Sequence, residues 1–480
     1  MSSEKKTNIL IFMPDEMRAD SLACMGNPII KTPNLDNVGK EGVVFTNCFA
    51  VNPVCAPSRC STFTGLYPHC SGHRSLYYLL QPHEENLFKF LKNSGYYIRM
   101  IGRNDLFSKK AFKTSVSKRT GGFSKVDLKA YLDSPPVEER FRKSFYLGKR
   151  GEKLVKDLDY SIIQEALEFL DSNPPEPFCL FLALAYPHPP YSVEEPYFSM
   201  YDRQKIPEPI PPKLDDKPHF MKEMYESYNL NLLSEEDKKE IIATYYGMVS
   251  RVDDQFGIII EKFKEKNYYD HTVVFFFGDH GDYTTDYGLT EKWSTGFQDC
   301  LIKVPLIIKI PGIKPNNNPI NNLVETIDLF PTMLEIANIK PKYTHFGKSL
   351  IPLIKGENNE HRDSVFAEGG YMPREPQCFE VKIKSPELPI IGIYYDKIRI
   401  SYDDPSTVSR SAMIRTKEWK YVARIEGKEE LYNLKSDSQE LINLIDDQNL
   451  EETKAKLKEE LLRWYIETSD NAPMKKERAL

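Results

Sequence analysis

The chain has 480 residues, of which 40% are apolar and 28% are charged, a composition typical of globular rather than disordered proteins. The 64 lysines and arginines are almost balanced by 70 aspartates and glutamates, so the net charge is −6, and there is no long basic run. This balance argues against nucleic acid or an anionic membrane as the main partner.

The beginning of the chain and its cysteines predict a cytoplasmic protein. Residues 1–7 include an acidic residue, and the apolar run at residues 9–13 is too short for a signal peptide or a membrane span. The eight cysteines are scattered without paired spacing, as is usual in a reducing compartment.

The first predicted strand, residues 8–13, is followed by the acidic pair Asp15 and Glu16. Functional groups of α/β proteins gather at the carboxyl ends of strands, where loops converge on a ligand. Two carboxylates at such a position are candidate ligands for a hard cation. The alternative is that Asp15 caps the following helix while Glu16 faces the solvent.

A second predicted strand, residues 43–47, leads to the sequence CAPSRCSTFTG at residues 55–65. Pro57 suits the first turn of a helix, where its missing N–H group is no loss, and the amide groups of that turn attract an anion. Arg59 would lie one helical turn from Cys55 and place a positive charge beside it. The alternative is a buried cysteine that begins an ordinary helix.

A third predicted strand, residues 96–101, follows a predicted helix over residues 87–94 and leads to Arg103 and Asp105. The next region, residues 107–157, is polar and contains several basic residues. We expect an inserted lid or specificity region that attracts an anionic substrate. The alternative is a solvated charged loop.

Two uninterrupted apolar runs, residues 178–185 and residues 272–277, are typical of strands buried on both faces of a sheet. The first run leads to His188, which lies between prolines, and the second leads to Asp279 and His280. A histidine in such a place is a candidate for substrate binding or proton transfer, although a lone histidine is more often structural. Between the two runs, a long amphipathic helix is predicted over residues 241–266.

From residue 362 the pattern changes to short strand-like runs that alternate with turns. We therefore expect a catalytic domain, residues 1–361, and a C-terminal subdomain, residues 362–480. The strand-like runs are residues 365–367, 390–395, 412–415, 419–421 and 430–434, and a helix is predicted over residues 451–466.

The segments after the predicted strands resemble the motifs of the sulfatases, a branch of the alkaline-phosphatase-like superfamily. Residues 55–65 match all six defined positions of the signature C-x-P-S-R-x-x-x-x-T-G, residues 187–190 match Pro-His-x-Pro, and residues 279–281 match Asp-His-Gly. The resemblance extends over nearly the whole chain. It implies an α/β sandwich around a large, mostly parallel mixed sheet, with a small C-terminal antiparallel sheet and a helix.

The resemblance also implies a chemistry. In this family a dedicated maturase oxidises the signature cysteine, here Cys55, to formylglycine, whose hydrate attacks the sulfur of a sulfate ester. Arg59 would help to activate this nucleophile, while His188 and Lys292 would stabilise the sulfate oxygens and the leaving group. The implied ligands of one divalent cation, usually Ca²⁺ with Mg²⁺ or Mn²⁺ as alternatives, are Asp15, Glu16, an oxygen of the modified Cys55, Asp279 and His280.

Three positions depart from the family pattern. Glu16 stands where sulfatases usually have aspartate, although its carboxylate still offers oxygen to a hard cation. Many sulfatases have Gly-Lys-x-His at the place where this chain has Arg103 and Asp105. Arginine carries the charge of that lysine but not its proton-transfer role, and Asp105 would have to replace the histidine as the base that collapses the hydrated intermediate.

The implied function is hydrolysis of a sulfate monoester, an aryl sulfate or a sulfated sugar, by a bacterial cytosolic enzyme that acts on imported substrate. One alternative is a phosphonate monoester or phosphodiester hydrolase, because these relatives share the cysteine motif and also lack the histidine of Gly-Lys-x-His. Another is a non-catalytic protein that binds an anion or a sugar while Cys55 stays a thiol.

Overall fold

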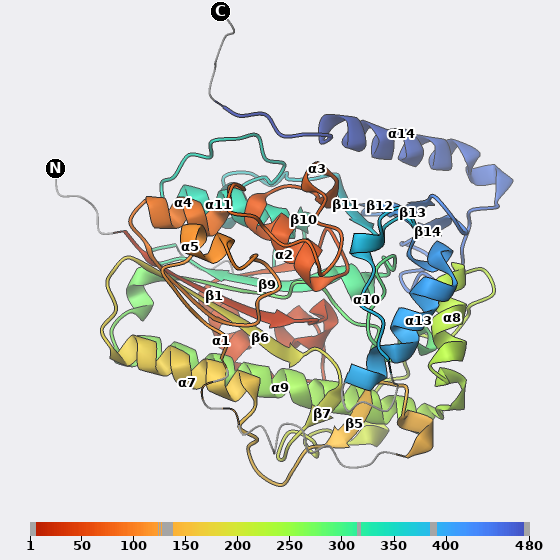
Figure 1. Cartoon of the computed structure of the whole chain (residues 1–480), viewed down its shortest axis with the longest axis horizontal. Helices are drawn as coiled ribbons and strands as arrows, with labels where there is room; N and C mark the ends of the chain where they lie inside the picture. The colour runs from red at the N-terminus through yellow and green to blue at the C-terminus, as the bar shows by residue number, and fades with distance from the viewer. Residues whose placement is uncertain are drawn as a thin grey trace, which may run out of the picture.

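The computed structural model describes residues 6–122, 124, 126, 138–313, 318–384 and 391–474. Helices cover both faces of a large sheet, and a smaller sheet lies to one side, next to the helix α14 (Glu451–Glu467) (Figure 1). This arrangement confirms the predicted α/β sandwich with a small C-terminal sheet. No helix in the described ranges has both the length and the apolar character needed to cross a membrane.

The large sheet has eight strands in the order β10-β2-β9-β8-β1-β6-β3-β4. At its centre, β1 (Asn8–Asp15) pairs in parallel with β6 (Phe178–Pro187) and β8 (Thr272–Phe277). All three strands are almost fully buried because helices cover both faces of the sheet. The strand β9 (Lys303–Lys309) is antiparallel to β8 and to β2 (Val43–Phe49), so the sheet is mixed. The other strands are β3 (Tyr97–Gly102), β4 (Lys118–Thr120) and β10 (Val324–Glu325).

Two layers of helices enclose this sheet (Figure 1). One layer contains α1 (Pro33–Glu41), α7 (Leu158–Asp171) and α9 (Glu235–Glu265), and the other contains α2 (Cys55–Thr64), α4 (Leu87–Asn93) and α11 (Leu329–Ile336). Each layer packs on its own buried apolar cluster. Further helices are α3 (Pro68–Ser71), α5 (Ala111–Ser115), α8 (His219–Ser227), α10 (Asp299–Ile302) and α12 (Ile351–Ile354).

The helix α9 begins six residues before its predicted start at residue 241. Its first turn is polar and shows no apolar period, so the sequence pattern hides it. A capping box fixes this start, because the Ser234 side chain accepts from the Asp237 N–H group while the Asp237 carboxylate accepts from the Ser234 N–H group.

The parallel strands bring together segments that lie far apart in the chain. Asp15 ends β1, His188 follows β6, and Asp279 follows β8. Because β1 lies between β6 and β8 and all three run in the same direction, these residues meet at one edge of the sheet. A register shift between Met13 and Asp15, opposite the end of β6, bends the strand pair at this edge.

The region after residue 362 contains the small antiparallel sheet, in the order β11-β12-β13-β14. The buried side chains of Leu457, Leu461 and Trp464 on α14 join the apolar cluster of this sheet. Four of the five predicted strand-like runs correspond to these strands. They are β11 (Ser364–Gly369), β12 (Ser411–Thr416), β13 (Trp419–Arg424) and β14 (Glu430–Asn433).

The strand predicted over residues 390–395 is wrong for its described part. Residues Ile391–Tyr394 form the 3-10 helix η10, and α13 (Tyr395–Asp403) follows directly. The run is apolar and aromatic but short, and periodicity alone does not separate a short buried strand from a short buried helix. The difference matters because α13 contributes Lys397, Ile398 and Ser401 to the lining of a cavity that also contains Cys55.

The expected lid, residues 107–157, contributes to two sheets. Its strand β4 extends the large sheet beside β3, and its strand β5 (Tyr146–Lys149) pairs with β7 (Tyr191–Val193) just after His188. Residues 123, 125 and 127–137 of this region lie outside the described residues. That the region acts as a lid stays a prediction.

A buried carboxylate ties the start of α7 to the end of β6. Asp159 accepts hydrogen bonds from the N–H groups of Ala185 (2.7 Å) and Tyr186 (2.9 Å), three and two residues before His188. Burial, together with the negative charge of Asp157, raises the pKa of Asp159 to about 7.

We predict that Asp159→Asn becomes more stable relative to the wild type as the pH rises from about 5 to about 8. The raised pKa means that the folded state favours the protonated carboxyl group, so wild-type stability is lost as the pH rises from the unfolded-state pKa of about 4 through the folded-state value. Thermal unfolding of both proteins across this range measures the effect. Asp171→Asn, at the exposed end of the same helix, is the control, and its melting temperature relative to the wild type should not change with pH. If the difference in melting temperature between Asp159→Asn and the wild type is the same at every pH, the prediction is contradicted.

Candidate active site

The helix α2 presents Cys55 to the ends of β1 and β8. Cys55 is the first residue of the helix, as the position of Pro57 predicts, and all ten residues of α2 are buried. The Cys55 Sγ atom lies 3.2 Å from Asp15 Oδ1 and 3.1 Å from His280 Nε2. Gly65 ends the helix in the left-handed conformation, where an added Cβ would meet the Phe330 ring at 2.7 Å.

Asp15, Cys55, Asp279 and His280 form a buried group whose ligand atoms all lie within 4.8 Å of one another. Two carboxylates and one imidazole suit a divalent cation such as Ca²⁺, Mg²⁺ or Mn²⁺. The sulfur of an unmodified Cys55 is a soft ligand, whereas an oxygen at this position would match the carboxylates. The structure therefore brings together four of the five predicted ligands in a set that fits a cation once residue 55 carries oxygen.

Arg59 connects two of these ligands. Its Nη2 atom lies 2.9 Å from Asp15 Oδ2, and its Nε donates to Asp279 Oδ2 at 2.8 Å. Ser58 donates to the carbonyl oxygen of Asp279 at 2.6 Å. Arg59 lies one turn from Cys55, as predicted. It places a positive charge beside Cys55 and also holds the carboxylates of Asp15 and Asp279.

Arg103 and Asp105 continue this network. Arg103 Nη1 lies 2.7 Å from Asp15 Oδ2, and Arg103 Nε lies 3.2 Å from Asp105 Oδ2. The same oxygen of Asp105 lies 3.5 Å from Arg59 Nη1. Burial opposes the charge of Asp15, but Arg103 and Arg59 outweigh it and hold the pKa of that carboxyl well below its usual range.

The Glu16 side chain contacts Lys292 and His188, while its N–H group donates to Asp279 Oδ1 at 3.0 Å. The Glu16 Oε2 atom lies 2.6 Å from Lys292 Nζ and 3.3 Å from His188 Nε2. Together with Asp15 and His188 it forms a second buried or half-buried group of metal-ligand type. Glu16 has a φ of 63°, so its backbone adopts the left-handed conformation that turns the side chain in this direction.

Lys292 carries the proton in its contact with His188. The two nitrogens, Lys292 Nζ and His188 Nε2, are 3.0 Å apart. Burial and the charge of Lys292 lower the pKa of His188 well below its usual value. Burial opposes the charge of Lys292, but Glu16 and Glu291 outweigh it and raise the pKa of Lys292 well above its usual value. The neutral His188 therefore accepts at Nε2, which leaves Nδ1 to donate to the carbonyl oxygen of Pro189 at 2.6 Å.

Sequence reasoning missed two residues that hold Lys292 in place. The buried Glu291 accepts from Lys292 Nζ at 2.7 Å and from Lys397 Nζ, on α13, at 2.6 Å. Burial opposes the charge of Glu291, but Lys292 and Lys397 outweigh it and lower the pKa of Glu291 to about 2. The position of Glu291 beside Lys292 was a usable signal, whereas the predicted strand at residues 390–395 gave no reason to consider Lys397.

A cavity of about 310 Å³ opens onto Cys55, Arg103 and Lys292. A second hollow of about 240 Å³ adjoins it, and both are lined by Arg103, His188 and Tyr394. The walls of the larger cavity, which we call the substrate cavity, include Arg74, Tyr371, Glu380, Tyr394, Ile398 and Ser401.

The fold is that of the alkaline-phosphatase-like enzymes, with the buried ligand group at the edge of its large sheet. The family model described as Sulfatase matches residues 7–339, and the chain belongs to the sulfatase family, whose members are sulfuric ester hydrolases. Arylsulfatase K of Xenopus laevis is 25% identical over 460 residues, covering 92% of this chain and 79% of that protein. The ulvan-active sulfatase of Formosa agariphila is 26% identical over 473 residues, covering 97% of this chain and 82% of that protein.

The solved structure of a phosphonate monoester hydrolase from Agrobacterium radiobacter has the same fold. Its TM-score is 0.75 with 96% of each chain covered, and the sequences are 21% identical.

We predict that Lys397→Met lowers kcat by about tenfold, since Lys292 loses the alignment that the Lys397–Glu291 ion pair gives it and a charged hydrogen bond contributes on the order of 2 kcal/mol. The measurement is steady-state turnover of an ester substrate with separate kcat and KM values. Lys382→Met is the matched control, because Lys382 is also a lysine against α13, where it lies over the Tyr402 ring. If Lys397→Met and Lys382→Met have equal kcat values, Lys397 does not align Lys292 through Glu291.

Proposed function

We propose that this protein hydrolyses a sulfate monoester, an aryl sulfate or a sulfated sugar, with a hydrated formylglycine formed from Cys55 by a maturase. The observation that supports this most is the position of Cys55. It begins α2, contacts Asp15 and His280 at 3.2 Å and 3.1 Å, and opens onto the substrate cavity. When oxidised and hydrated, residue 55 supplies the hydroxyl that attacks sulfur, and it later releases sulfate by an elimination that restores the aldehyde.

The cation that we propose for this site is Ca²⁺. Asp15, Asp279 and His280 would hold it together with an oxygen of residue 55, and it would lower the pKa of the attacking hydroxyl and offset the charge of the ester. Arg59 keeps the Asp15 and Asp279 carboxylates turned toward this point. Elemental analysis of the purified protein that finds no bound divalent cation would contradict the proposal.

The remaining residues have separate tasks. Arg103 and Lys292 place two positive charges on the cavity side of residue 55, where they can bind the sulfate oxygens. Lys292 stays protonated and donates a hydrogen bond to the departing oxygen, and His188 accepts a hydrogen bond from Lys292 that fixes its direction. Asp105, which lines the cavity, is the carboxylate proposed to take the proton of the second hydroxyl in the elimination that expels sulfate. Water protonates the departing alcohol and rehydrates the aldehyde, and the protons of the attacking hydroxyl and of Asp105 pass to the solvent, so the site returns to its starting state.

The state of Cys55 is tested by the mass of the tryptic peptide of residues 41–59. Formylglycine lowers its mass by about 18 Da relative to the thiol form and makes it reactive toward an aldehyde probe. Cys48 lies in the same peptide and is the internal control, because fragment ions should show it unchanged. Cys55→Ala should lose more than about 99% of turnover, whereas Cys48→Ala should not; a Cys55→Ala protein with full turnover would refute the mechanism.

The second hollow favours a second candidate function, the hydrolysis of phosphonate monoesters or phosphodiesters. A sulfate monoester carries one organic group, which the substrate cavity can hold. A phosphonate monoester or a phosphodiester carries two, and the hollow beside Arg103 and His188 offers space for the other. The likeness of the fold to a phosphonate monoester hydrolase agrees with this candidate.

Assays with 4-nitrophenyl sulfate and 4-nitrophenyl phenylphosphonate separate the two candidates. We expect higher kcat/KM for the sulfate, and Leu147→Trp, which fills the second hollow, should reduce only the phosphonate reaction by about tenfold or more. Leu147→Ala is the control, because it leaves the hollow open. A clear preference of the wild type for the phosphonate would replace our first candidate with the second.

A further inference from the structure

Two loops carry or adjoin the proposed cation ligands. The β1 loop, residues 16–21, follows Asp15 directly. The β8 loop, residues 278–292, contains Asp279 and His280. A cation between these ligands requires that the two loops keep a fixed relative position, since ligand distances to a metal vary by only about 0.2 Å.

Both loops contain backbone conformations that side chains disfavour. A positive φ places the Cβ atom close to the following carbonyl oxygen, so such a residue persists only where surrounding contacts hold it. The residues concerned are Glu16 (63°), Thr284 (45°), Thr285 (71°), Tyr287 (56°) and Glu291 (64°).

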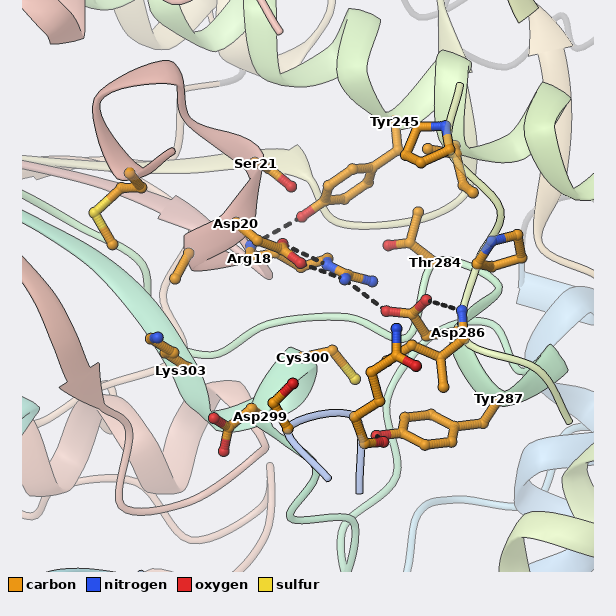
Figure 2. Close-up of a pocket in the computed structure, with 18 of the residues that line it drawn as sticks. Arg18, Asp20, Ser21, Tyr245, Thr284, Asp286, Tyr287, Asp299, Cys300 and Lys303 are labelled. Carbon is orange, nitrogen blue, oxygen red and sulfur yellow. Dashed lines mark hydrogen bonds and ion pairs between the residues drawn. The ribbon is translucent and has the colours of Figure 1, made fainter. Parts of the chain in front are cut away.

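Arg18 of the β1 loop supplies contacts of this kind to the β8 loop. Its Nη1 atom donates to the carbonyl oxygens of Tyr283 (2.8 Å) and Asp282 (3.4 Å), and its Nη2 atom donates to Asp286 Oδ2 at 2.6 Å. Asp20 accepts from Nε at 2.8 Å and from Nη2 at 2.6 Å within the β1 loop itself. Figure 2 shows the guanidinium group between the Asp20 and Asp286 carboxylates.

The main chain of Arg18 is also held. Its N–H group donates to the Tyr245 hydroxyl at 3.0 Å, and this hydroxyl donates to the carbonyl oxygen of Glu16 at 2.8 Å. Tyr245 belongs to α9, so it connects the β1 loop to a helix of the core. One residue, Arg18, therefore joins the β1 loop, the β8 loop and this helix.

The residues of these contacts line a cavity of about 420 Å³, and Figure 2 shows its lining around Arg18, Tyr245 and Asp286. Among the residues that the structure describes, none lines both this cavity and the substrate cavity. Because the loops border a cavity here, close packing contributes less to their alignment, and the hydrogen bonds and ion pairs of Arg18 contribute more.

We propose that Arg18 is a positioning residue that aligns the β1 loop with the β8 loop, so that Asp15, Asp279 and His280 reach one cation. Arg18 does not line the substrate cavity, and its effect on the reaction passes through the ligands that it positions. The inference rests on the proposed cation site, but the alignment of the loops is measurable without cation or substrate.

The test compares Arg18→Met with Arg362→Met. Arg362 is also buried and paired with two carboxylates, those of Glu325 and Asp328, which belong to neither loop. We expect hydrogen exchange to rise in Arg18→Met in peptides from both loops, and the Kd for Ca²⁺ measured by calorimetry to rise about 10- to 100-fold. Arg362→Met should lower the melting temperature without a selective change in either loop.

Asp286→Asn is a second variant that tests the same contact if Arg18→Met does not fold. It removes the charge that faces Arg18 from the β8 loop but keeps an acceptor for the Ile210 N–H group. It should show the same pattern with smaller amplitude. The proposal is overturned if either variant folds and its hydrogen exchange in both loops equals that of the wild type. A wild type that binds no Ca²⁺ contradicts the cation site of the proposed function, whereas the exchange measurement alone decides the role of Arg18.

Discussion

The buried carboxylate of Asp15 is the charge on which the rest of the site depends. It lies at the end of the central strand, where an isolated negative charge without solvent would be strongly unfavourable. Arg59 and Arg103 compensate it from α2 and from the segment after β3. These partners cannot be lost singly, because removing one member of a buried ion pair leaves the other uncompensated. Through Arg59, the charge of Asp15 thus ties α2, and with it Cys55, to the end of β1.

A second set of charges extends from the centre of the sheet into the C-terminal region. Lys292 contacts Glu16 and Glu291, and Glu291 also contacts Lys397, each at 2.6 Å or 2.7 Å. Burial raises the pKa of Glu16 well above its usual value, so Glu291, which stays ionised between the two lysines, is the firm negative charge of this set. This arrangement keeps a proton on Lys292, where an anionic ester needs positive charge. It also means that α13, which follows the catalytic region by many residues, is part of the electrostatic environment of the reaction.

Much of the architecture was predictable because its causes are local. Apolar runs such as residues 272–277 define buried strands, and the groups that follow their ends meet because parallel strands share one edge. Cys55 and Arg59 follow from a dense motif. Contacts between distant segments were not predictable in the same way. Lys397 lies two residues beyond the segment predicted as a strand, on a helix that was not predicted, and the direction of the Glu16 side chain depends on a backbone conformation that no local pattern indicated.

Most wall residues of the substrate cavity come from a different part of the chain than the residues of its floor. The floor residues, among them Cys55 and Lys292, belong to segments held by mutually compensating charges, where a substitution disturbs several partners at once. Wall residues such as Tyr371, Glu380 and Ser401 belong to the C-terminal region and lie outside that charge network. Evolution can therefore alter the alcohol that is accepted by exchanging wall residues while the chemistry stays unchanged. For the same reason, a library restricted to these wall positions is a rational starting point for redirecting the enzyme to new esters.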